Sequence, residues 1–206
     1  MPNSFDCIIV GGGGAGLAAA YSAACQGATV ALLERRPQPG GTTGIAVGSF
    51  TAAGTRWQQR AGIDDNPEDH DEDVSLFADP ELEARNNQPL RRFFLEHAAE
   101  TLHWLQEELR LNYVGPSPEP PNRCPRMHNV VPGAKAYVVR FQLALRRRGA
   151  TVITGAAVTR LLQENGRISG VEFSQDGKQH QLRARRGVVL ATGDYANNPE
   201  MIARYK

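Results

Sequence analysis

A run of glycines directly after an apolar segment constrains this chain more than any other feature of its sequence. The continuous apolar run from Cys7 to Val10 is typical of a strand buried on both faces, and it leads into the loop Gly11 to Gly16. A helix of small residues follows, from Leu17 to Ala24, and a second strand, Thr29 to Leu33, ends at Glu34. This order of strand, glycine loop, helix, strand and acid predicts a Rossmann-like dinucleotide-binding unit.

The glycines of the loop and the acid after the second strand suggest how a dinucleotide is held. Gly11 allows the tight turn, Gly13 lets the backbone approach a pyrophosphate, and Gly16 lets the helix pack closely on the sheet. The start of the helix presents unpaired N–H groups and a positive dipole end to the phosphates. The Glu34 carboxylate accepts hydrogen bonds from a ribose 2′-OH. A flexible glycine loop is the alternative, and the surrounding strands, helix and acid argue against it.

Length and composition restrict the remaining possibilities. The 206 residues suffice for one domain, or for one domain and part of another, and 41% hydrophobic residues support a real core. The formal net charge of +1 gives no electrostatic drive toward nucleic acid or an anionic membrane. The first strand begins within a few residues of Met1, so we expect neither a signal peptide nor a membrane span. The three cysteines, Cys7, Cys25 and Cys124, lack metal-ligand spacing, so we expect no metal site and a cytoplasmic location.

A second glycine-rich segment, Gly40-Gly41-Thr42-Thr43-Gly44, follows the second strand. Backbone amides and threonine hydroxyls brought together by glycines can line a phosphate and a flat ring, because no bulky side chain keeps a ligand away. An ordinary surface loop explains the composition equally well.

Taken together, the loop Gly11 to Gly16, Glu34 and the segment Gly40 to Thr43 resemble the FAD-binding domain of one flavoprotein family. This is the fumarate reductase/succinate dehydrogenase family, which also contains 3-ketosteroid dehydrogenases, and the similarity covers nearly the whole chain. Membrane-bound members attach FAD through a histidine soon after the double glycine. This chain has no histidine between Gly41 and Glu68, so the resemblance implies FAD held non-covalently.

The second half of the chain predicts more of the same sheet. A helix, Ala134 to Arg148, ends in Gly149-Ala150-Thr151-Val152, which repeats Gly27-Ala28-Thr29-Val30 and indicates two strands of one parallel sheet. Asn165-Gly166 and Asp176-Gly177 then predict two tight hairpins. The predicted fold is α/β, a glutathione-reductase-type FAD domain whose parallel sheet carries an inserted three-stranded antiparallel meander, with strands Val158 to Leu162, Ile168 to Phe173 and Gln179 to Arg183. A separate buried strand, Val188 to Ala191, should follow.

That last strand leads into Thr192-Gly193, which resembles the family's A-T-G-G signature beside the cofactor, except that Asp194 replaces the second glycine. The departure puts the local turn in doubt. The resemblance also places adenine against the backbone near Ala157 and Val158. The cofactor-binding residues that it implies are Gly11, Gly13, Gly14, Ala15, Gly16, Glu34, Arg35, Gly40, Gly41, Thr42, Thr43, Gly48, Val158, Ala191, Thr192 and Gly193.

The middle of the chain is less informative. We interpret Asp64 to Asp73, with His70 among its acids, as a solvated loop in preference to a metal site. Helical spacing from Leu90 to Leu109, through Phe94 and Ala98, predicts a helix with Pro89 in its first position. A proline-rich loop follows at Pro116 to Pro125. The cations near its end either face an anionic substrate or phosphate or lie on a plain surface loop: Arg123, Arg126 and His128.

The helix start Asn198-Pro199-Glu200 is the last feature of the sequence. In the resembled family the substrate-capping domain and a closing FAD segment lie beyond this point, so we interpret residues 1–206 as one incomplete FAD-binding domain with no assignable catalytic residue. The full-length protein is then a flavin-dependent oxidoreductase acting on a small organic substrate, and the isolated chain should be inactive. The alternatives are a non-catalytic dinucleotide-binding module, one chain of a split flavoprotein completed by a second chain, or an NAD-binding domain.

Overall fold

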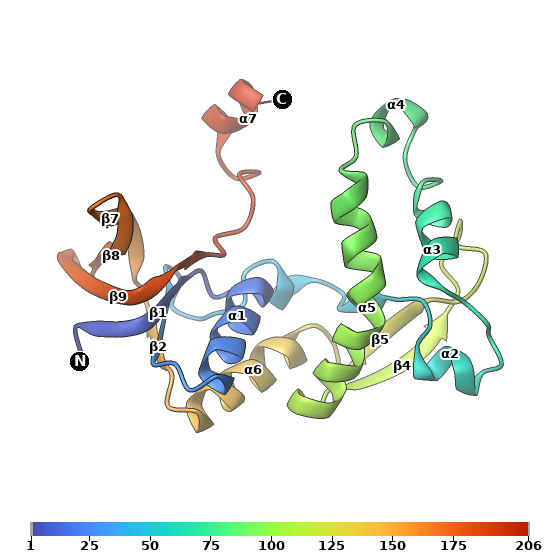
Figure 1. Cartoon of the computed structure of the whole chain (residues 1–206), viewed down its shortest axis with the longest axis horizontal. Coiled ribbons are helices and arrows are strands. Elements are labelled where there is room, and N and C mark those ends of the chain that lie inside the picture. Colours follow the sequence, from blue (N-terminus) through green and yellow to red (C-terminus); the bar gives the residue numbers. More distant parts are fainter. Residues whose placement is uncertain (1, 206) are drawn as a thin grey trace. The chain divides into compact units, whose positions relative to one another are not determined.

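The computed structural model describes residues 2–205 and divides them into two compact units (Figure 1). The first unit combines the beginning of the chain, up to Ala46, with everything from Tyr137 onward. The second unit is the intervening segment, Val47–Ala136. The chain therefore leaves the first unit after its second strand and returns to it at a helix.

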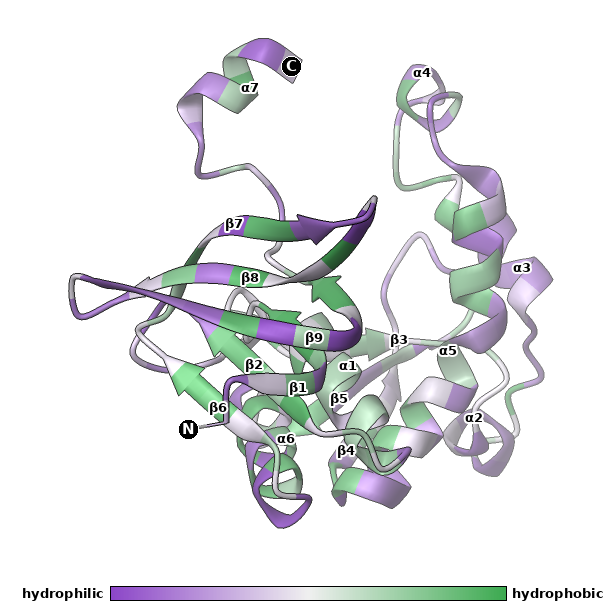
Figure 2. Ribbon diagram, turned by 60° about the vertical axis from the view of Figure 1, so that its left-hand side comes forward, coloured by the Kyte–Doolittle hydropathy of each residue, from purple (hydrophilic) through white to green (hydrophobic). Residues whose placement is uncertain are grey.

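A six-stranded sheet organises the first unit, in the order β6-β2-β1-β9-β8-β7. Strands β6, β2 and β1 and the last part of β9 run parallel, whereas β7, β8 and β9 form an antiparallel meander, as the sequence predicts. Figure 2 shows the two parts of the sheet joined through β9, with hydrophobic residues concentrated on β1 and β2. The strand bounds are β1 Ser4–Val10, β2 Val30–Glu34, β6 Thr151–Thr154, β7 Ala157–Glu164, β8 Arg167–Gln175 and β9 Lys178–Leu190.

The separate buried strand predicted at Val188 to Ala191 is wrong, because β9 runs without a break from Lys178 to Leu190. The same strand pairs with β8 through its first half and with β1 through its second half. Arg185 lies where the register of β9 against β1 shifts by one residue, and its side chain donates hydrogen bonds to Asp6 and Thr29. The far end is also exposed rather than buried, with 59% of Leu190 accessible.

Helices α1 (Gly14–Cys25) and α6 (Lys135–Arg147) pack against each other, with Tyr21 and Phe141 in edge-to-face contact at 6.1 Å. Both helices end in the same way. The N–H groups of Gly27 and Ala28 donate to carbonyls of the last turn of α1, and Gly149 and Ala150 repeat these bonds on α6. The strands that follow, β2 and β6, pair in parallel. The repeated glycine exits thus correctly predict two neighbouring strands.

A hydrophobic cluster of the first unit joins the two halves of the sheet, since residues of the parallel strands and of the meander both contribute to it. This continuity is why the meander is part of the unit. The buried members are Phe5, Ile8, Val10, Ala31, Leu33, Ile153, Ala156, Val171, Phe173, Leu182 and Ala184.

The second unit combines a three-stranded antiparallel sheet, in the order β3-β5-β4, with four helices. The sequence predicts only the longest of these helices. That helix, α5, begins at Gln88 with Asn87 as its cap, so Pro89 takes the second position and not the first. The predicted apolar stripe is confirmed in its second part, where Ala98, Leu102, Leu105 and Leu109 are buried, and is wrong in its first part, where Leu90 and Phe94 are exposed and Leu95 is buried instead. The elements are β3 Ser49–Thr51, α2 Arg56–Arg60, α3 Pro67–Val74, α4 Pro80–Glu83, α5 Gln88–Leu109, β4 Asn112–Ser117 and β5 Met127–Val131.

The last helix, α7 (Pro199–Tyr205), confirms the predicted helix start, because the Asn198 side chain accepts a hydrogen bond from the Met201 N–H at 3.0 Å. A short 3-10 turn, η1 (Thr43–Ile45), belongs to the second glycine segment. Within residues 2–205 none of the helices has the length and apolar character needed to cross a bilayer.

Candidate functional site: the glycine loops of the first unit

Two glycines of the first loop are required by the fold itself. Gly11 has φ +104°, and a Cβ there would lie 2.3 Å from the carbonyl oxygen of Ala191. A Cβ at Gly16 would lie 1.8 Å from the carbonyl oxygen of Gly11. Contacts this short cannot form, so only glycine lets α1 approach the ends of β1 and β9. The packing role predicted for Gly16 is confirmed.

Gly13 differs, because nothing within residues 2–205 requires a glycine there. Its φ of −77° is open to any L residue. Apart from its chain neighbours, no atom of the described chain lies within 4 Å of the point that a Cβ would occupy. A side chain would therefore project into open space at the start of α1. The fold itself therefore gives no steric reason for glycine at this position.

The start of α1 is electrostatically suited to an anionic group. Gly13 caps the helix without a side-chain hydrogen bond, and the described first turn contains no acidic residue. No acid of the helix itself therefore offsets the positive end of its dipole, although the Glu34 carboxylate approaches it from β2 and accepts a hydrogen bond from Gly12 N at 2.7 Å. Thr43 Oγ1 accepts a hydrogen bond from Gly14 N at 3.1 Å and brings the second glycine segment against the helix start. The two glycine segments are thus in direct contact and are not independent loops.

Glu34, at the end of β2, connects these two segments. Its side chain is almost fully buried, and its oxygens accept hydrogen bonds from Gly12 N at 2.7 Å and Arg36 N at 2.8 Å. The carbonyl of Gly12 in turn accepts a bond from Gly40 N at 2.8 Å. Each carboxylate oxygen has a second lone pair, so these bonds leave acceptor capacity for a ribose hydroxyl. Glu34 thus has a structural task that the sequence does not reveal.

The second glycine segment is shaped by its backbone. Gly40 and Gly41 have φ +148° and +52°, and a Cβ at Gly41 would lie 3.2 Å from the Cα of Gly13. Gly44 N donates to the Gly40 carbonyl and closes the turn around Thr42. Gly48 lies in the second unit, where its φ of +99° and its contacts with other residues of that unit account for glycine.

The residues after β9 complete the edge of the sheet at which the glycine loops lie. Ala191 N donates to the carbonyl of Val10, which continues the pairing with β1 beyond the last strand residue. Gly193 has φ +84°, a backbone conformation that favours glycine. Asp194 does not have a positive φ, and its carboxylate accepts a hydrogen bond from Ala196 N at 2.8 Å. The doubt that Asp194 raises is resolved, since aspartate stabilises the turn.

Val158 lies at the start of β7 and packs against the core of the first unit. Just before it, Gly155 N and Ala156 N donate to the carbonyls of Arg36 and Glu34. The entry to β7 is thereby tied to the end of β2, close in the fold to the Glu34 carboxylate.

Comparison with known proteins is consistent with this geometry. The profile of a family described as "FAD binding domain" matches residues 6–205 of the chain. The chain belongs to this FAD-binding domain family. The match includes both glycine segments, the meander and the whole second unit, and it confirms FAD as the cofactor that the resemblance implies.

Relatives of this FAD-binding domain are oxidoreductases. The NADH:fumarate oxidoreductase of Klebsiella pneumoniae (strain 342) is 33% identical over 214 aligned positions, which cover 100% of this chain and 22% of that protein. A solved structure of the open conformation of a flavocytochrome c3 fumarate reductase superposes with a TM-score of 0.88 at 27% identity, covering 99% of this chain and 36% of that chain. The 3-ketosteroid-Δ4-(5α)-dehydrogenase of Rhodococcus jostii RHA1 gives 0.83 at 27% identity, covering 98% and 48%. The chain thus spans less than half the length of each.

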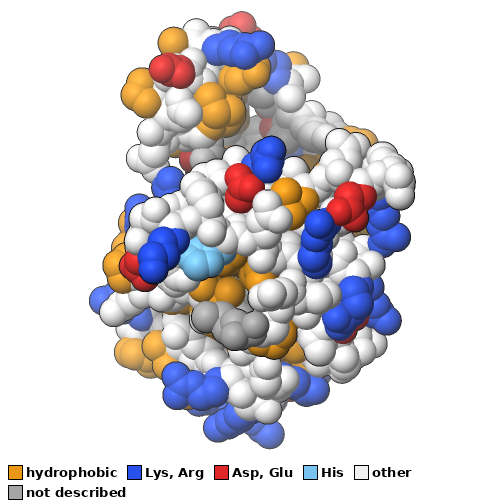
Figure 3. Space-filling model, turned by 90° about the vertical axis from the view of Figure 1, so that its left-hand side faces the viewer, with side chains coloured by type: hydrophobic (Ala, Val, Ile, Leu, Met, Phe, Trp, Pro, Cys, Tyr) orange, Lys and Arg blue, Asp and Glu red, His pale blue; other side chains and the backbone are white. Residues whose placement is uncertain are grey.

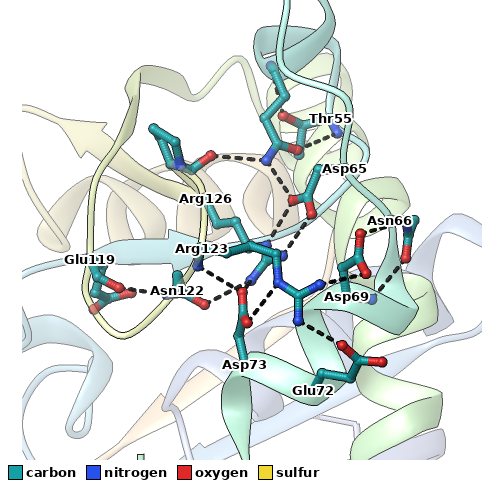
Figure 4. Close-up of polar contacts among 12 residues, drawn as sticks. Thr55, Asp65, Asn66, Asp69, Glu72, Asp73, Glu119, Asn122, Arg123 and Arg126 are labelled. Atoms are coloured by element: carbon teal, nitrogen blue, oxygen red, sulfur yellow. Dashed lines mark hydrogen bonds and ion pairs between the residues drawn. The ribbon is translucent and has the colours of Figure 1, made fainter. Parts of the chain in front are cut away.

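The acidic segment of the second unit is not the solvated loop that we interpret from its composition. Residues Pro67–Val74 form helix α3, and Arg126 lies fully buried against it (Figure 4). Its guanidinium donates two hydrogen bonds to Asp65, at 2.7 and 2.8 Å, and one to Asp73 at 2.5 Å. No group of His, Cys, Asp and Glu within residues 2–205 has the arrangement of a metal site. The acids serve as partners of arginines.

The same network corrects the hypothesis for the cations after the proline-rich loop. Arg123 pairs with Asp73, and also with two acids of α3 shown in Figure 4. His128 is buried, with Nε2 3.0 Å from Thr55 Oγ1 and Nδ1 3.3 Å from the Phe50 carbonyl oxygen. Arg126 and His128 therefore neither face an anionic substrate nor lie on a surface loop, whereas the exposed Arg123 does lie on a surface loop, as the alternative predicts.

The ionisation of this cluster follows from its geometry. Burial alone would raise the pKa of Asp73, but hydrogen bonds from the Arg123 N–H and from both guanidinium groups outweigh it and lower the pKa to about 2. Burial alone would also raise the pKa of Asp65. Hydrogen bonds from Arg126 and Gln58 outweigh this effect and lower the pKa below its usual value. Both carboxylates are charged at neutral pH, so the cluster contains a buried, mutually compensated set of charges.

His70 gives a pH prediction for the second unit. Burial, and then the charge of Arg126, lower the pKa of this imidazole from 6.5 to about 4. The unfolded chain therefore binds the proton more tightly, and the free energy of unfolding falls as pH decreases from 6.5 toward 4. We expect His70 alone to account for a loss of roughly 2 kcal/mol between pH 7.5 and pH 5.

The measurement is urea unfolding followed by tryptophan fluorescence, since both tryptophans, Trp57 and Trp104, belong to the second unit. His70→Phe should remove most of this pH dependence. An unaltered profile in that variant would show that His70 is not buried in its neutral form.

Proposed function

We propose that the glycine loops of the first unit bind FAD with its pyrophosphate against the backbone of Gly13 and the start of α1. The ribose then hydrogen-bonds with Glu34, and Thr42, Thr43 and the turn after β9 lie beside the pyrophosphate and flavin. The observation that supports this placement is the open space at Gly13, where the fold imposes no need for glycine. The remaining residues of the first unit that we assign to the cofactor are Gly11, Gly14, Ala15, Gly16, Arg35, Gly40, Gly41, Val158, Ala191, Thr192 and Gly193.

For the full-length protein we propose a flavin-dependent oxidoreductase acting on a small organic substrate, of fumarate/succinate or ketosteroid type. Bound FAD supplies the two-electron chemistry, exchanging a hydride with one carbon of a C–C single or double bond while a proton is exchanged at the other. This chain contributes the binding and orientation of the cofactor. The fumarate- and steroid-converting relatives support the reaction class, and no residue of this chain is assigned to proton transfer.

An absorption titration tests the cofactor. The purified chain incubated with FAD and passed through a desalting column should retain the yellow spectrum of oxidised flavin. Retention of nicotinamide dinucleotide with exclusion of FAD would instead indicate an NAD-binding domain. Retention of FAD without turnover of any substrate by the full-length protein would favour a non-catalytic binding module.

The partners and location that we propose are those of such an enzyme: a cytoplasmic protein, completed where necessary by a second chain, without nucleic acid. The face in Figure 3 shows Lys and Arg side chains at separate positions among acidic and hydrophobic ones. Among the arginines of the first unit, Arg185 pairs with Asp6 and Arg160 with Glu172. This face offers no continuous basic surface for a polyanion.

Glu34→Gln should weaken FAD binding by about 1 to 3 kcal/mol, because a carboxylate that accepts from a ribose hydroxyl makes a charge-assisted bond and an amide does not. Glutamine preserves the shape of the side chain. Glutamine has only one side-chain oxygen, however, whereas Glu34 uses both of its oxygens to accept from Gly12 N and Arg36 N. The substitution can therefore destabilise the fold, and thermal stability must be measured beside the FAD titration. Equal affinity for FAD at equal stability would place the ribose elsewhere.

The flavin should be released from the chain by acid precipitation, because no histidine that could attach it lies between Gly41 and Glu68. After trichloroacetic acid treatment we expect the yellow colour in the supernatant. Colour that remains in the washed pellet would reveal a covalent link to another residue.

A further inference from the structure

The second unit contains a cavity of about 420 Å³ that no part of the proposed FAD site uses. Its walls come from β3, α3, α5 and the loop between β4 and β5, all within Val47–Ala136. Most of the surface is provided by hydrophobic side chains, among them Phe50, Val74, Phe77, Phe94 and Leu95. A space of this size and lining is typical of a site for a small organic molecule.

The entrance is apolar as well. Phe77 and Phe94 line the cavity and are also more than half exposed, at 52% and 58%. Side chains of this kind are usually covered, and their exposure at the opening favours an apolar ligand over a strongly hydrated one.

The charged groups in the wall do not favour an anion. Arg91 is nearly buried, and its guanidinium donates at 2.6 Å to Asp71 and at 2.6 Å to Glu83. Glu119, also in the wall, accepts a hydrogen bond from the Thr51 hydroxyl at 3.1 Å. Arg91, the single cation of the wall, is thus already compensated by the carboxylates of Asp71 and Glu83. Glu119 adds a further negative charge to the wall.

His70 provides a polar group on the same wall. Its side chain is 2% exposed, and its Nδ1 is buried without a hydrogen-bond partner in the part of the chain that the structure describes. A buried polar atom left without a partner is unfavourable, so such atoms are usually paired with a ligand or an ordered water. The imidazole is neutral at physiological pH.

We propose that this cavity binds a neutral, mostly apolar small molecule that carries one hydroxyl or amide group and hydrogen-bonds through it to His70. The apolar walls take up the body of the ligand, and the imidazole selects for the polar group. The site is contained in the second unit and does not depend on the FAD site of the first.

Three probes of the same size separate the elements of the proposal: 2-naphthol, which is neutral and hydroxylated; naphthalene, which lacks the hydroxyl; and 2-naphthoate, which is anionic. Dissociation constants are measured at pH 7.5 by fluorescence and competition, on the full chain loaded with FAD. We expect 2-naphthol to bind about tenfold more tightly than naphthalene, the usual effect of one net hydrogen bond. We expect 2-naphthoate to bind most weakly.

Two variants test the location. His70→Phe should abolish the preference for 2-naphthol over naphthalene while naphthalene still binds. Val74→Trp should fill the cavity and weaken both probes at least tenfold. The tryptophan fluorescence unfolding curve verifies that each variant is folded, and if Val74→Trp does not fold, 2-naphthol-induced NMR shifts of the His70 ring report the location directly.

The outcomes decide the proposal. Preferential binding of 2-naphthoate, equal binding of 2-naphthol and naphthalene, or a preference that persists in His70→Phe would each overturn it. The Gly13→Val variant, which should lose FAD, is expected to retain the tenfold preference, and this separates failure of the cavity proposal from failure of the FAD assignment.

Discussion

The variant Gly13→Val should lose FAD binding while the fold remains intact. The valine side chain would occupy the open space at the start of α1 that the pyrophosphate requires, and we expect affinity to fall at least 100-fold, roughly 3 kcal/mol. Because no atom of the described chain opposes a Cβ at this position, the free energy of unfolding should fall by only about 1 kcal/mol, the usual cost of a poor helix N-cap residue. Binding and folding are measured separately, by flavin absorption titration and by urea unfolding.

Two other glycines are matched controls for this change. Gly16→Ala should lose both FAD and stability, because its Cβ would lie 1.8 Å from a carbonyl oxygen. Gly187→Val should retain both, since Gly187 lies in β9 with open space around the new Cβ and without a positive φ. If Gly13→Val binds FAD normally, the pyrophosphate does not pass over this loop.

Arg126→Met should cause the largest loss of stability in the second unit, about 3 to 5 kcal/mol. Methionine keeps the apolar stem but leaves the Asp65 and Asp73 carboxylates buried without their common partner. Urea unfolding monitored by tryptophan fluorescence reports this unit selectively. FAD binding to the first unit need not follow the same transition.

Arg56→Met is the matched control for Arg126→Met. Arg56 pairs with Glu107 on the surface, where both side chains are about half exposed, so its loss should change stability by less than about 1 kcal/mol. Equal effects of the two substitutions would mean that the Arg126 cluster is solvated and contributes little.

The sequence predicts the first unit well because its signals are local. A glycine with a positive φ, a hairpin dipeptide and a repeated helix exit each specify the backbone of a few residues, and the strand pairing follows from connection rules. The exception is β9. Two arginines between its halves suggest a break, but Arg185 is satisfied by Asp6, which lies 179 residues away. A local pattern contains no information about such a partner.

The second unit could be predicted only in part, because its organisation depends on long-range ion pairs. Arg126 and Asp65 are 61 residues apart, so the acids of α3 look like solvated charge from composition alone. One local signal was available. Asn66-Pro67-Glu68 matches Asn198-Pro199-Glu200, from which α7 is correctly predicted, and Asn66 caps α3 by accepting a bond from the Asp69 N–H.

Of the candidate site, the positions of Gly11 and Gly16 follow from the motif, since their need for glycine is steric and local. The contact between Thr43 and Gly14 and the double acceptance by Glu34 do not, because each depends on how separate loops meet in space.

The hydrogen bonds that Glu34 and Thr43 accept from the glycine loop also affect the entropic cost of binding a cofactor. Loops rich in glycine lose much conformational entropy when a ligand orders them, and this reduces affinity. Here the chain itself fixes Gly12, Gly14 and Gly40 before any ligand arrives. The two glycine segments are therefore preorganised. We expect the free energy of FAD binding not to be reduced by the entropic cost of ordering them.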